Sequence, residues 1–188
     1  MKTAIVLLAN GFEEVEAITP INYLNQAGVK VTVVAIGNNL NVIGMHGITI
    51  SADILLQDLI KQHELVDAII IPGGTPGAQN IAASKEASTL IIEMASTRKL
   101  ICAISDSPVI ILAPLGLLSD KTFTCFPGME NQIQNANWIE ERVAIDDNII
   151  TSRSPGTAGE FTIAIIKQLL DETQGERIAK KVLIMADC

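Results

Sequence analysis

The chain has 188 residues, of which 48% are hydrophobic and 18% are charged. A chain this apolar can bury enough surface to offset the entropy cost of ordering it, which excludes an intrinsically disordered protein. The 21 acidic residues against 13 basic residues give a formal net charge of −8, so the basic surface that nucleic-acid binding requires is missing.

The N-terminal stretch MKTAIVLLANGFEEVE contains a six-residue apolar run followed by acidic residues. This run is too short for the apolar region of a signal peptide, and no later stretch approaches the ~18 uninterrupted apolar residues of a membrane span. The chain has three cysteines, Cys102, Cys125 and Cys188. Because their number is odd and their spacing fits neither a metal site nor a disulfide framework, we expect free thiols. The sequence therefore predicts a cytoplasmic protein that contacts neither a membrane nor nucleic acid.

Short apolar runs rich in β-branched residues alternate along the chain with segments of helical periodicity. Continuous apolar runs are typical of strands buried on both faces, so the alternation predicts an α/β protein with a mostly parallel sheet between two helix layers. The expected strands cover residues 4–8, 29–36, 66–71, 100–104, 143–145 and 149–151. The expected helices cover residues 13–26, 55–61, 85–97, 108–115, 157–171 and 176–183.

Residues 42–52 break this alternation, because Gly44 and Gly47 mark turns between two extended pieces. We expect a small β-hairpin that projects from the sheet. Farther along the chain, Ser107 and Pro108 predict a helix start, with the serine as cap and the proline at the first helical position.

Ligands of such sheets collect outside the carboxyl ends of the parallel strands, so the loops that follow the strands are the candidates for function. The first loop, ANGFEEVE, brings Glu13, Glu14 and Glu16 into the start of a helix. Compensation of the helix dipole explains most acidic clusters at this position. Glu16 lies a further turn along and can face back over the strand ends, which makes it a candidate site residue.

The second loop, IPGGTPGAQN, follows the strand that ends at Ile71. Gly73 and Gly74 can present backbone N–H groups to an anion or a developing oxyanion, or they can simply form a tight turn. The loop lacks the lysine of a phosphate loop and the third glycine of a dinucleotide fingerprint. We therefore expect no nucleotide cofactor.

The third loop lies in KLICAISDSPVIIL, where a buried strand turns sharply into a helix at Ser105. A strained turn of this kind requires small residues two positions away on either side, and Ala103 and Ser107 meet that requirement. Ser105 is therefore a candidate nucleophile. The alternative is an ordinary strand–turn–helix junction in which Ser105, Asp106 or Ser107 only caps the helix.

A serine nucleophile needs a base within hydrogen-bond reach, which is usually a histidine. His63 lies at a polar helix end and is most simply a solvated residue. His46 lies at the tip of the expected hairpin, which could reach its own site only by folding over, or the site of another subunit through a dimer contact. No two His, Cys or Asp residues have ligand spacing, so we expect no metal.

The stretches NGFEEVEAITPINYLNQAGVKVTV, IPGGTPGAQN and TSRSPGTAGEF, together with the turn region, resemble the ThiJ/PfpI family, within the superfamily of the Parkinsonism-associated deglycase. The resemblance runs over nearly the whole chain. It implies a flavodoxin-like sandwich, a single class I glutamine amidotransferase-like domain over residues 1–188, and a homodimer. Members are described as glyoxalases, deglycases or redox-responsive chaperones, and some as thiazole-biosynthesis or protease-like proteins.

The resemblance assigns the family's acid to Glu16, its backbone oxyanion donors to Gly74 and Asp106, and its reactive cysteine to Ser105. This chain therefore departs from the family by carrying serine at the turn. Cys102 lies three residues earlier in an apolar strand, where we expect a buried and inert thiol. Asp106 is also unusual, because a carboxylate at an oxyanion site repels the charge that the site should stabilise.

A serine hydroxyl is far less acidic than a thiol, and a carboxylate is a poor base for an alcohol. The sequence therefore predicts a pocket that binds a small carbonyl, carboxylate or phosphate compound without glyoxalase, deglycase or cysteine redox-sensor chemistry. Two alternatives remain open. One is an esterase- or amidase-like hydrolase that uses Ser105 with Glu16 or a cross-subunit His46, and the other is a non-catalytic dimer with a chaperone or interaction role.

Overall fold

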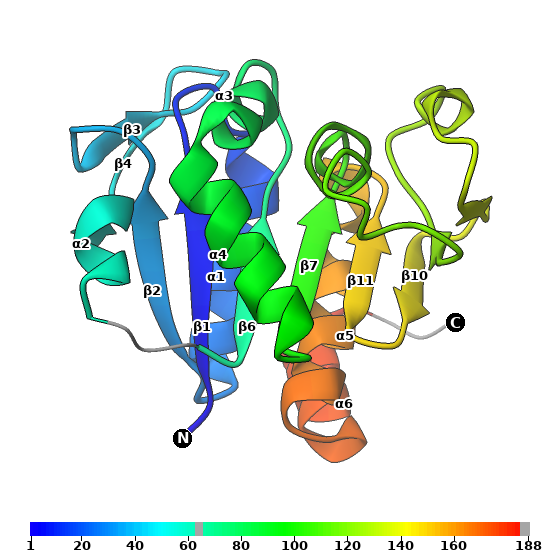
Figure 1. Ribbon diagram of the computed structural model, residues 1–188. Coiled ribbons are helices and arrows are strands. Elements are labelled where there is room, and N and C mark those ends of the chain that lie inside the picture. The colour runs from blue at the N-terminus through cyan, green and yellow to red at the C-terminus, as the bar shows by residue number, and fades with distance from the viewer. Residues whose placement is uncertain (63–65, 185–188) are drawn as a thin grey trace.

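The computed structural model describes residues 1–62 and 66–184. Its centre is a seven-stranded sheet with the order β10-β11-β7-β6-β1-β2-β5, in which β10 pairs antiparallel with β11 and all other neighbours are parallel (Figure 1). The strands are β1 (Thr3–Leu8), β2 (Lys30–Ala35), β5 (Ile54–Leu55), β6 (Ala68–Ile71), β7 (Leu100–Ile104), β10 (Val143–Asp146) and β11 (Ile149–Ser152).

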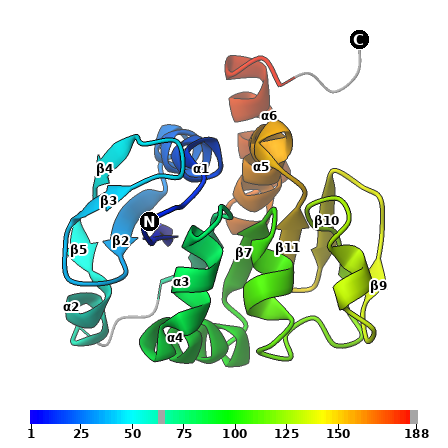
Figure 2. The same ribbon diagram turned by 90° about the horizontal axis from the view of Figure 1, so that it is seen from above.

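Helices cover both faces of the sheet (Figure 2). One layer contains α1 (Glu14–Gln26), α5 (Ala158–Leu169) and α6 (Glu172–Lys181). The other contains α2 (Leu56–Ile60), α3 (Gly77–Ala83), α4 (Lys85–Ser96) and a π-helix at Pro108–Leu112. This arrangement confirms the predicted parallel sheet between two helix layers.

The two layers follow from the alternation of side chains along each strand. In β1, Val6 and Leu8 belong to the apolar cluster under α1 and α5, whereas Ile5 and Leu7 belong to the cluster under α3 and α4. All four side chains are almost completely buried. The continuous apolar runs of the sequence therefore correspond to strands that are covered on both faces.

The expected hairpin is present and consists of β3 (Asn41–Ile43) and β4 (Thr49–Ser51), which pair antiparallel. It lies over the loop that follows β1. The Gly11 N–H donates to the Ile43 carbonyl and the Met45 N–H donates to the Phe12 carbonyl, both at 2.8 Å. The hairpin is thus held close to the start of α1.

Several elements differ from the sequence prediction. Helix α3 lies in a stretch that reads as a loop because it begins with glycine and proline, yet Ala78 and Ile81 are completely buried. Helix α6 begins four residues earlier than expected, because Asp171 caps it by accepting from the Gln174 N–H. Strand β5 was not predicted either, because Leu55 was expected to begin a helix but pairs with Ala35 of β2. A small sheet of β8 (Thr122–Phe123) and β9 (Asn137–Trp138) was also not predicted.

A helix does begin at Pro108 with Ser107 as the preceding residue, as predicted, but the predicted side-chain cap is wrong. The Ser107 hydroxyl does not cap a helix but donates to the Pro72 carbonyl at 2.6 Å, and so ties the start of the helix to the end of β6. The helix that begins at Pro108 is a single π-turn, in which the Ala113 N–H donates to the Pro108 carbonyl at 3.0 Å.

Among residues 1–62 and 66–184, no helix is long enough and apolar enough to cross a bilayer.

Candidate functional site

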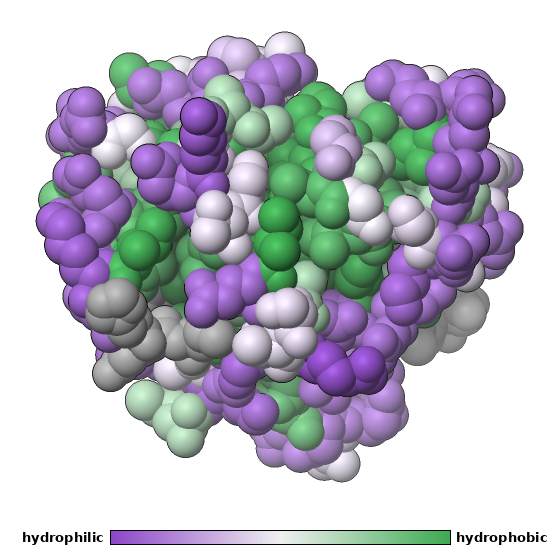
Figure 3. Space-filling view, in the orientation of Figure 1, coloured by the Kyte–Doolittle hydropathy of each residue, from purple (hydrophilic) through white to green (hydrophobic). Residues whose placement is uncertain are grey.

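The loops after β1, β6 and β7 meet at one edge of the sheet, where the carboxyl ends of the parallel strands lie. They enclose a cavity of about 540 Å³, whose lining includes Glu13, Glu16, His46, Ser105 and Asp106. Figure 3 shows a hollow between two lobes at the upper edge of the molecule. The strands in Figure 1 point toward this edge. Candidate residues from all three loops and from the hairpin therefore share one cavity.

Ser105 occupies the sharp turn that the sequence predicts. Its φ of 66° is a left-handed conformation that residues other than glycine rarely adopt. The turn is held from both sides, because the Ser105 N–H donates to the Ser152 carbonyl at 3.0 Å and the Ser105 carbonyl accepts from the Phe126 N–H at 2.8 Å. Ser105 is thus presented at the cavity by a strained but well-supported backbone.

The cysteines near this turn are buried. Cys102 lies within β7 between Ile70 and Ile150 of the neighbouring strands, and burial raises the pKa of its thiol well above the usual value. Cys125 is also buried, and burial together with the charge of Glu130 raises its pKa to about 12. Neither thiol forms thiolate to a useful extent at neutral pH. Cys188 and His63 lie outside the described residues.

Glu16 lies completely buried in the first turn of α1. Its Oε2 accepts from the Gly73 N–H at 2.8 Å, whereas Oε1 has no hydrogen-bond partner among the described residues. Burial raises the pKa of Glu16 to about 8, and the charges of Glu13 and Asp106 act in the same direction, against the Gly73 N–H and the neighbouring Ser105 hydroxyl. At neutral pH the carboxyl group is therefore mostly protonated.

Asp106 turns its carboxylate back onto the loop after β6. Its Oδ1 accepts from the Gly74 N–H at 3.1 Å, and its Oδ2 accepts from the Thr75 hydroxyl at 3.4 Å. Burial raises the pKa of Asp106, although the N–H groups of Gly74 and of Asp106 itself lower it. The two backbone donors that the resemblance assigns to an oxyanion thus both face the carboxylate of Asp106.

Glycine is required at position 73 because the surrounding groups approach the backbone closely. A Cβ atom there would overlap Asp106 Oδ1, Ser105 Cβ and Glu16 Oε2. These three side chains therefore meet directly above Gly73. The spacing of the residues along the chain does not predict this meeting, since Glu16 and Gly73 are 57 residues apart.

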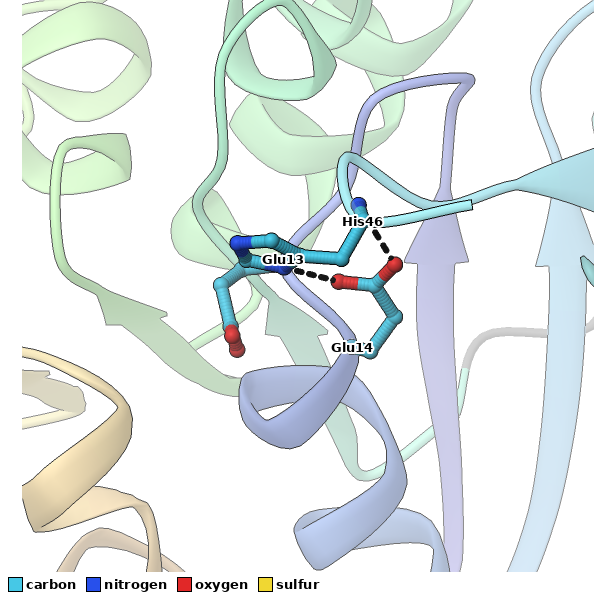
Figure 4. A group of neighbouring side chains, drawn as sticks. All are labelled: Glu13, Glu14 and His46. Atoms are coloured by element: carbon cyan, nitrogen blue, oxygen red, sulfur yellow. Dashed lines mark hydrogen bonds and ion pairs between the residues drawn. The ribbon is translucent and has the colours of Figure 1, made fainter. Parts of the chain in front are cut away.

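His46 lines the cavity of its own chain, which the sequence analysis expected only if the hairpin folded over. Its backbone N–H donates to Glu14 Oε1 at 2.8 Å, and its Nδ1 lies 2.8 Å from Glu14 Oε2 (Figure 4). Burial raises the pKa of Glu14, but hydrogen bonds from His46, from the Glu14 N–H itself and from the Ile48 N–H together lower it below its usual value. In the described part of the chain, His46 has no hydrogen bond to Ser105.

Glu13, Glu14 and His46 each offer a ligand atom, and these atoms lie within 4.8 Å of one another (Figure 4). The sequence analysis did not predict this group, because it considered the spacing of His, Cys and Asp residues only. The carboxylates already have internal roles, because Glu13 accepts from the Glu16 N–H at 2.7 Å and Glu14 binds the hairpin. Helix capping and attachment of the hairpin thus account for the cluster.

Comparison with known proteins identifies clear relatives. Residues 2–168 match the DJ-1/PfpI family. Protein DJ-1 homolog B from Arabidopsis thaliana is 37% identical over 180 residues, which are 96% of this chain but only 41% of that protein, so the chain spans less than half of its length. The Parkinson disease protein 7 homolog of Danio rerio is 33% identical over 189 residues, covering 99% of this chain and 98% of that protein.

A solved structure, that of oxidized Toxoplasma gondii DJ-1, superposes with a TM-score of 0.94 at 31% identity and covers 97% of this chain and 98% of the other. Agreement at this level confirms the flavodoxin-like fold that the resemblance implies.

Proposed function

Because the chain belongs to the DJ-1/PfpI family, we propose that it keeps the family pocket as a binding site for a small carbonyl compound without covalent thiol chemistry. The observation that carries this proposal is the alcohol of Ser105 at the left-handed turn, with Cys102 and Cys125 both buried. A hydroxyl at this position does not ionise near neutral pH, so glyoxalase, deglycase and cysteine redox-sensor reactions lack their nucleophile.

A carbonyl compound is favoured over an anion as the ligand because the backbone N–H donors of the site are already occupied. The N–H of Gly73 already binds Glu16, and the N–H of Gly74 already binds Asp106. A carboxylate or phosphate ligand would therefore meet two carboxyl groups in place of free amides. A carbonyl oxygen, in contrast, can accept a hydrogen bond from the Ser105 hydroxyl, which lines the cavity.

The hydrolase alternative is less well supported. It needs a base in contact with Ser105, and the ring of His46 is instead engaged by Glu14. Glu16 is mostly protonated at neutral pH and so is available mainly as a hydrogen-bond donor. Covalent labelling of Ser105 by a fluorophosphonate serine probe would favour the hydrolase over the proposed binding function.

Methylglyoxal turnover tests the proposal directly. We expect no measurable turnover by the native protein, and we expect hydroxyacetone, a small neutral ketone, to raise the melting temperature. Glu16→Gln should weaken this stabilisation, because the substitution changes the group beneath the cavity that hydrogen-bonds the Ser105 hydroxyl. Turnover of methylglyoxal that Ser105→Ala abolishes would refute the proposal, as would the absence of any stabilisation by hydroxyacetone.

We also propose that the chain forms a homodimer. The support is a set of exposed apolar side chains on α1 and on the hairpin that lies beside it, here called the α1–hairpin patch. Exposed apolar groups that gather on neighbouring elements mark interaction surfaces more often than scattered ones do. The patch consists of Val15, Ile18, Ile43, Met45 and Ile48, which are each between 41% and 53% exposed.

A further inference from the structure

The surface of the cavity is largely apolar, although carboxyl groups lie at its polar end. Its apolar side chains come from four separate parts of the chain, which are the hairpin, the π-helix, the segment after β8 and the start of α5. They are Met45, Ile110, Phe126, Pro127, Met129 and Pro155. Apolar side chains that converge on one concave surface, with few polar groups beside them, are typical of a site for a partly apolar small molecule.

Two of these side chains leave much of their surface uncovered. Phe126 is 44% exposed and Met45 is 43% exposed, although phenylalanine and methionine are among the residues that proteins most often bury. Contact between water and apolar surface is unfavourable, so a ligand that covers both side chains gains affinity. The uncovered surface therefore favours a ligand with an apolar part.

The backbone fixes Phe126 beside the polar end of the cavity. Its N–H donates to the Ser105 carbonyl at 2.8 Å, and its carbonyl accepts from the Met129 N–H at 3.2 Å. Gly128, with a φ of 89°, lies within the turn that this second hydrogen bond closes. The aromatic residue and the serine are thus held next to each other before any ligand binds, which lowers the cost of ordering them on binding.

Ser105 provides a hydrogen-bond donor at this end. Its side chain lines the cavity, whereas Glu16 is completely buried beneath it. Since Glu16 is mostly protonated at neutral pH, it can donate to the oxygen of the Ser105 hydroxyl. The serine O–H is then free to donate to an acceptor on the ligand, next to the apolar part of the wall.

The size of the cavity indicates a ligand larger than a three-carbon ketone. Its volume is about 540 Å³. Cavities of roughly 300–1,000 Å³ hold whole drug-sized molecules, so a three-carbon ketone would leave most of the space to water. An apolar substituent of the size of a phenyl ring would replace this water and cover the exposed side chains.

We infer that the cavity selects carbonyl compounds that carry an apolar substituent about as large as a phenyl ring, with the carbonyl oxygen on the Ser105 hydroxyl and the substituent against Phe126 and Met45. This inference rests on the proposed function and narrows it to one class of carbonyl compound. Phe126 is then a specificity-determining residue, because its ring offers both apolar area and an aromatic contact to a ring on the ligand.

Two methyl ketones provide the test. Phenylacetone has a phenyl ring in the place of the hydroxyl group of hydroxyacetone. Titration of the isotope-labelled full chain, followed by NMR, measures the affinity and locates the bound molecule. Phenylacetone should bind more tightly by roughly tenfold or more, because its ring buries apolar surface. The largest shifts of backbone amide signals should fall on residues 45–46, 105–106 and 126–129.

Variants assign the preference to residues. Phe126→Ala should lower the ratio of phenylacetone to hydroxyacetone affinity by roughly fivefold, and Phe126→Leu, which keeps an apolar side chain, should give an intermediate ratio. Ser105→Ala should weaken both ketones. Ile92→Ala is the matched control, because Ile92 lies on α4, is similarly exposed at 47% and is absent from the cavity lining that the structure describes. It should keep the native ratio.

The outcomes separate the inference from the function on which it rests. Equal or tighter binding of hydroxyacetone in the native protein overturns the apolar class and leaves the proposed carbonyl site standing. A ratio that Ile92→Ala lowers as much as Phe126→Ala also overturns the inference, as do phenylacetone shifts that fall outside the cavity, because the ring would then bind apolar surface in general. Failure of both ketones to bind refutes the proposed function itself.

Discussion

At the turn after β7, two consecutive residues decide which chemistry the cavity can support. Ser105 contributes an alcohol in a left-handed conformation, and Asp106 places a carboxylate on the Gly74 N–H. The carboxylate removes a donor that could stabilise a developing negative charge and adds a charge that opposes one. Under the proposed function, both residues disfavour nucleophilic chemistry, and the carboxylate disfavours an anionic ligand.

Glu16 makes stability depend on pH in a direction opposite to that of most carboxyl groups. Its pKa rises from 4.5 to about 8 on folding, mainly because the group is buried. Between these values the folded protein binds more protons than the unfolded chain, so the free energy of unfolding falls as the pH rises through this window. The slope approaches about 1.4 kcal/mol per pH unit for one proton. The raised pKa of Asp106 contributes in the same direction.

Urea unfolding at pH 5, 6, 7 and 8 measures this dependence. We expect Glu16→Gln to flatten it, because glutamine stays neutral at every pH while its carbonyl can still accept from the Gly73 N–H. Glu176→Gln should keep the native slope, since this side chain is exposed. An unchanged slope in Glu16→Gln would mean that Glu16 is ionised in the folded protein at neutral pH.

The hairpin of β3 and β4 is the element that closes one side of the cavity. Its tip contributes His46, while its position depends on Glu14 at the start of α1. The carboxylate also accepts from the Ile48 N–H at 3.4 Å, so one side chain serves three groups of the tip. A Cβ atom at Gly44 would overlap this carboxylate, which explains the glycine at that turn.

Removing the carboxylate should loosen the hairpin more than the rest of the fold. We expect Glu14→Ala to lower the unfolding free energy by roughly 1–3 kcal/mol, because partly buried N–H groups of the tip lose their acceptor. Hydrogen exchange at residues 44–48 should accelerate, while exchange in β1 and β6 follows the global change only. Glu93→Ala on the exposed face of α4 is the control and should leave the hairpin protected. Uniform acceleration across the sheet would contradict a local role for Glu14.

At the scale of the whole molecule, the α1–hairpin patch and the cavity lie next to each other. Met45 belongs to both, and the hairpin that carries it also carries His46. A second copy covering the patch would therefore bury apolar surface and limit the movement of the hairpin at the same time. Dimer formation and the shape of the cavity should then be linked.

Sedimentation velocity tests the dimer. The native chain should sediment as a dimer at micromolar concentration, and the double variant Val15→Lys with Ile48→Lys should sediment as a monomer, because two charges in an apolar interface are costly to desolvate. Ile92→Lys introduces a charge at an apolar side chain on α4 that is similarly exposed, at 47%, and should leave the dimer intact. A native monomer would remove the support for the proposed interface.

Local sequence patterns were enough to predict six of the seven strands of the sheet, most helices, the hairpin and the sharp turn at Ser105. These features depend on hydrophobic periodicity, glycine positions and small neighbours close along the chain. The patterns failed at α3, where a glycine- and proline-rich start concealed a helix stabilised by burial of Ile81. They also failed at Ser107, whose hydroxyl finds an acceptor 35 residues away in place of a local cap.

The tertiary structure alone decided what the candidate residues face. Asp106 and Gly74 are 32 residues apart, as are His46 and Glu14, and each pair meets because the fold brings separate loops to one end of the sheet. Asp106 meets the Gly74 N–H, and Glu16 meets the Gly73 N–H, through contacts between different loops. The raised pKa of Glu16 depends mainly on its burial. Residue types and spacing identified the participants, but the sequence contains no local signal for their distances or their protonation.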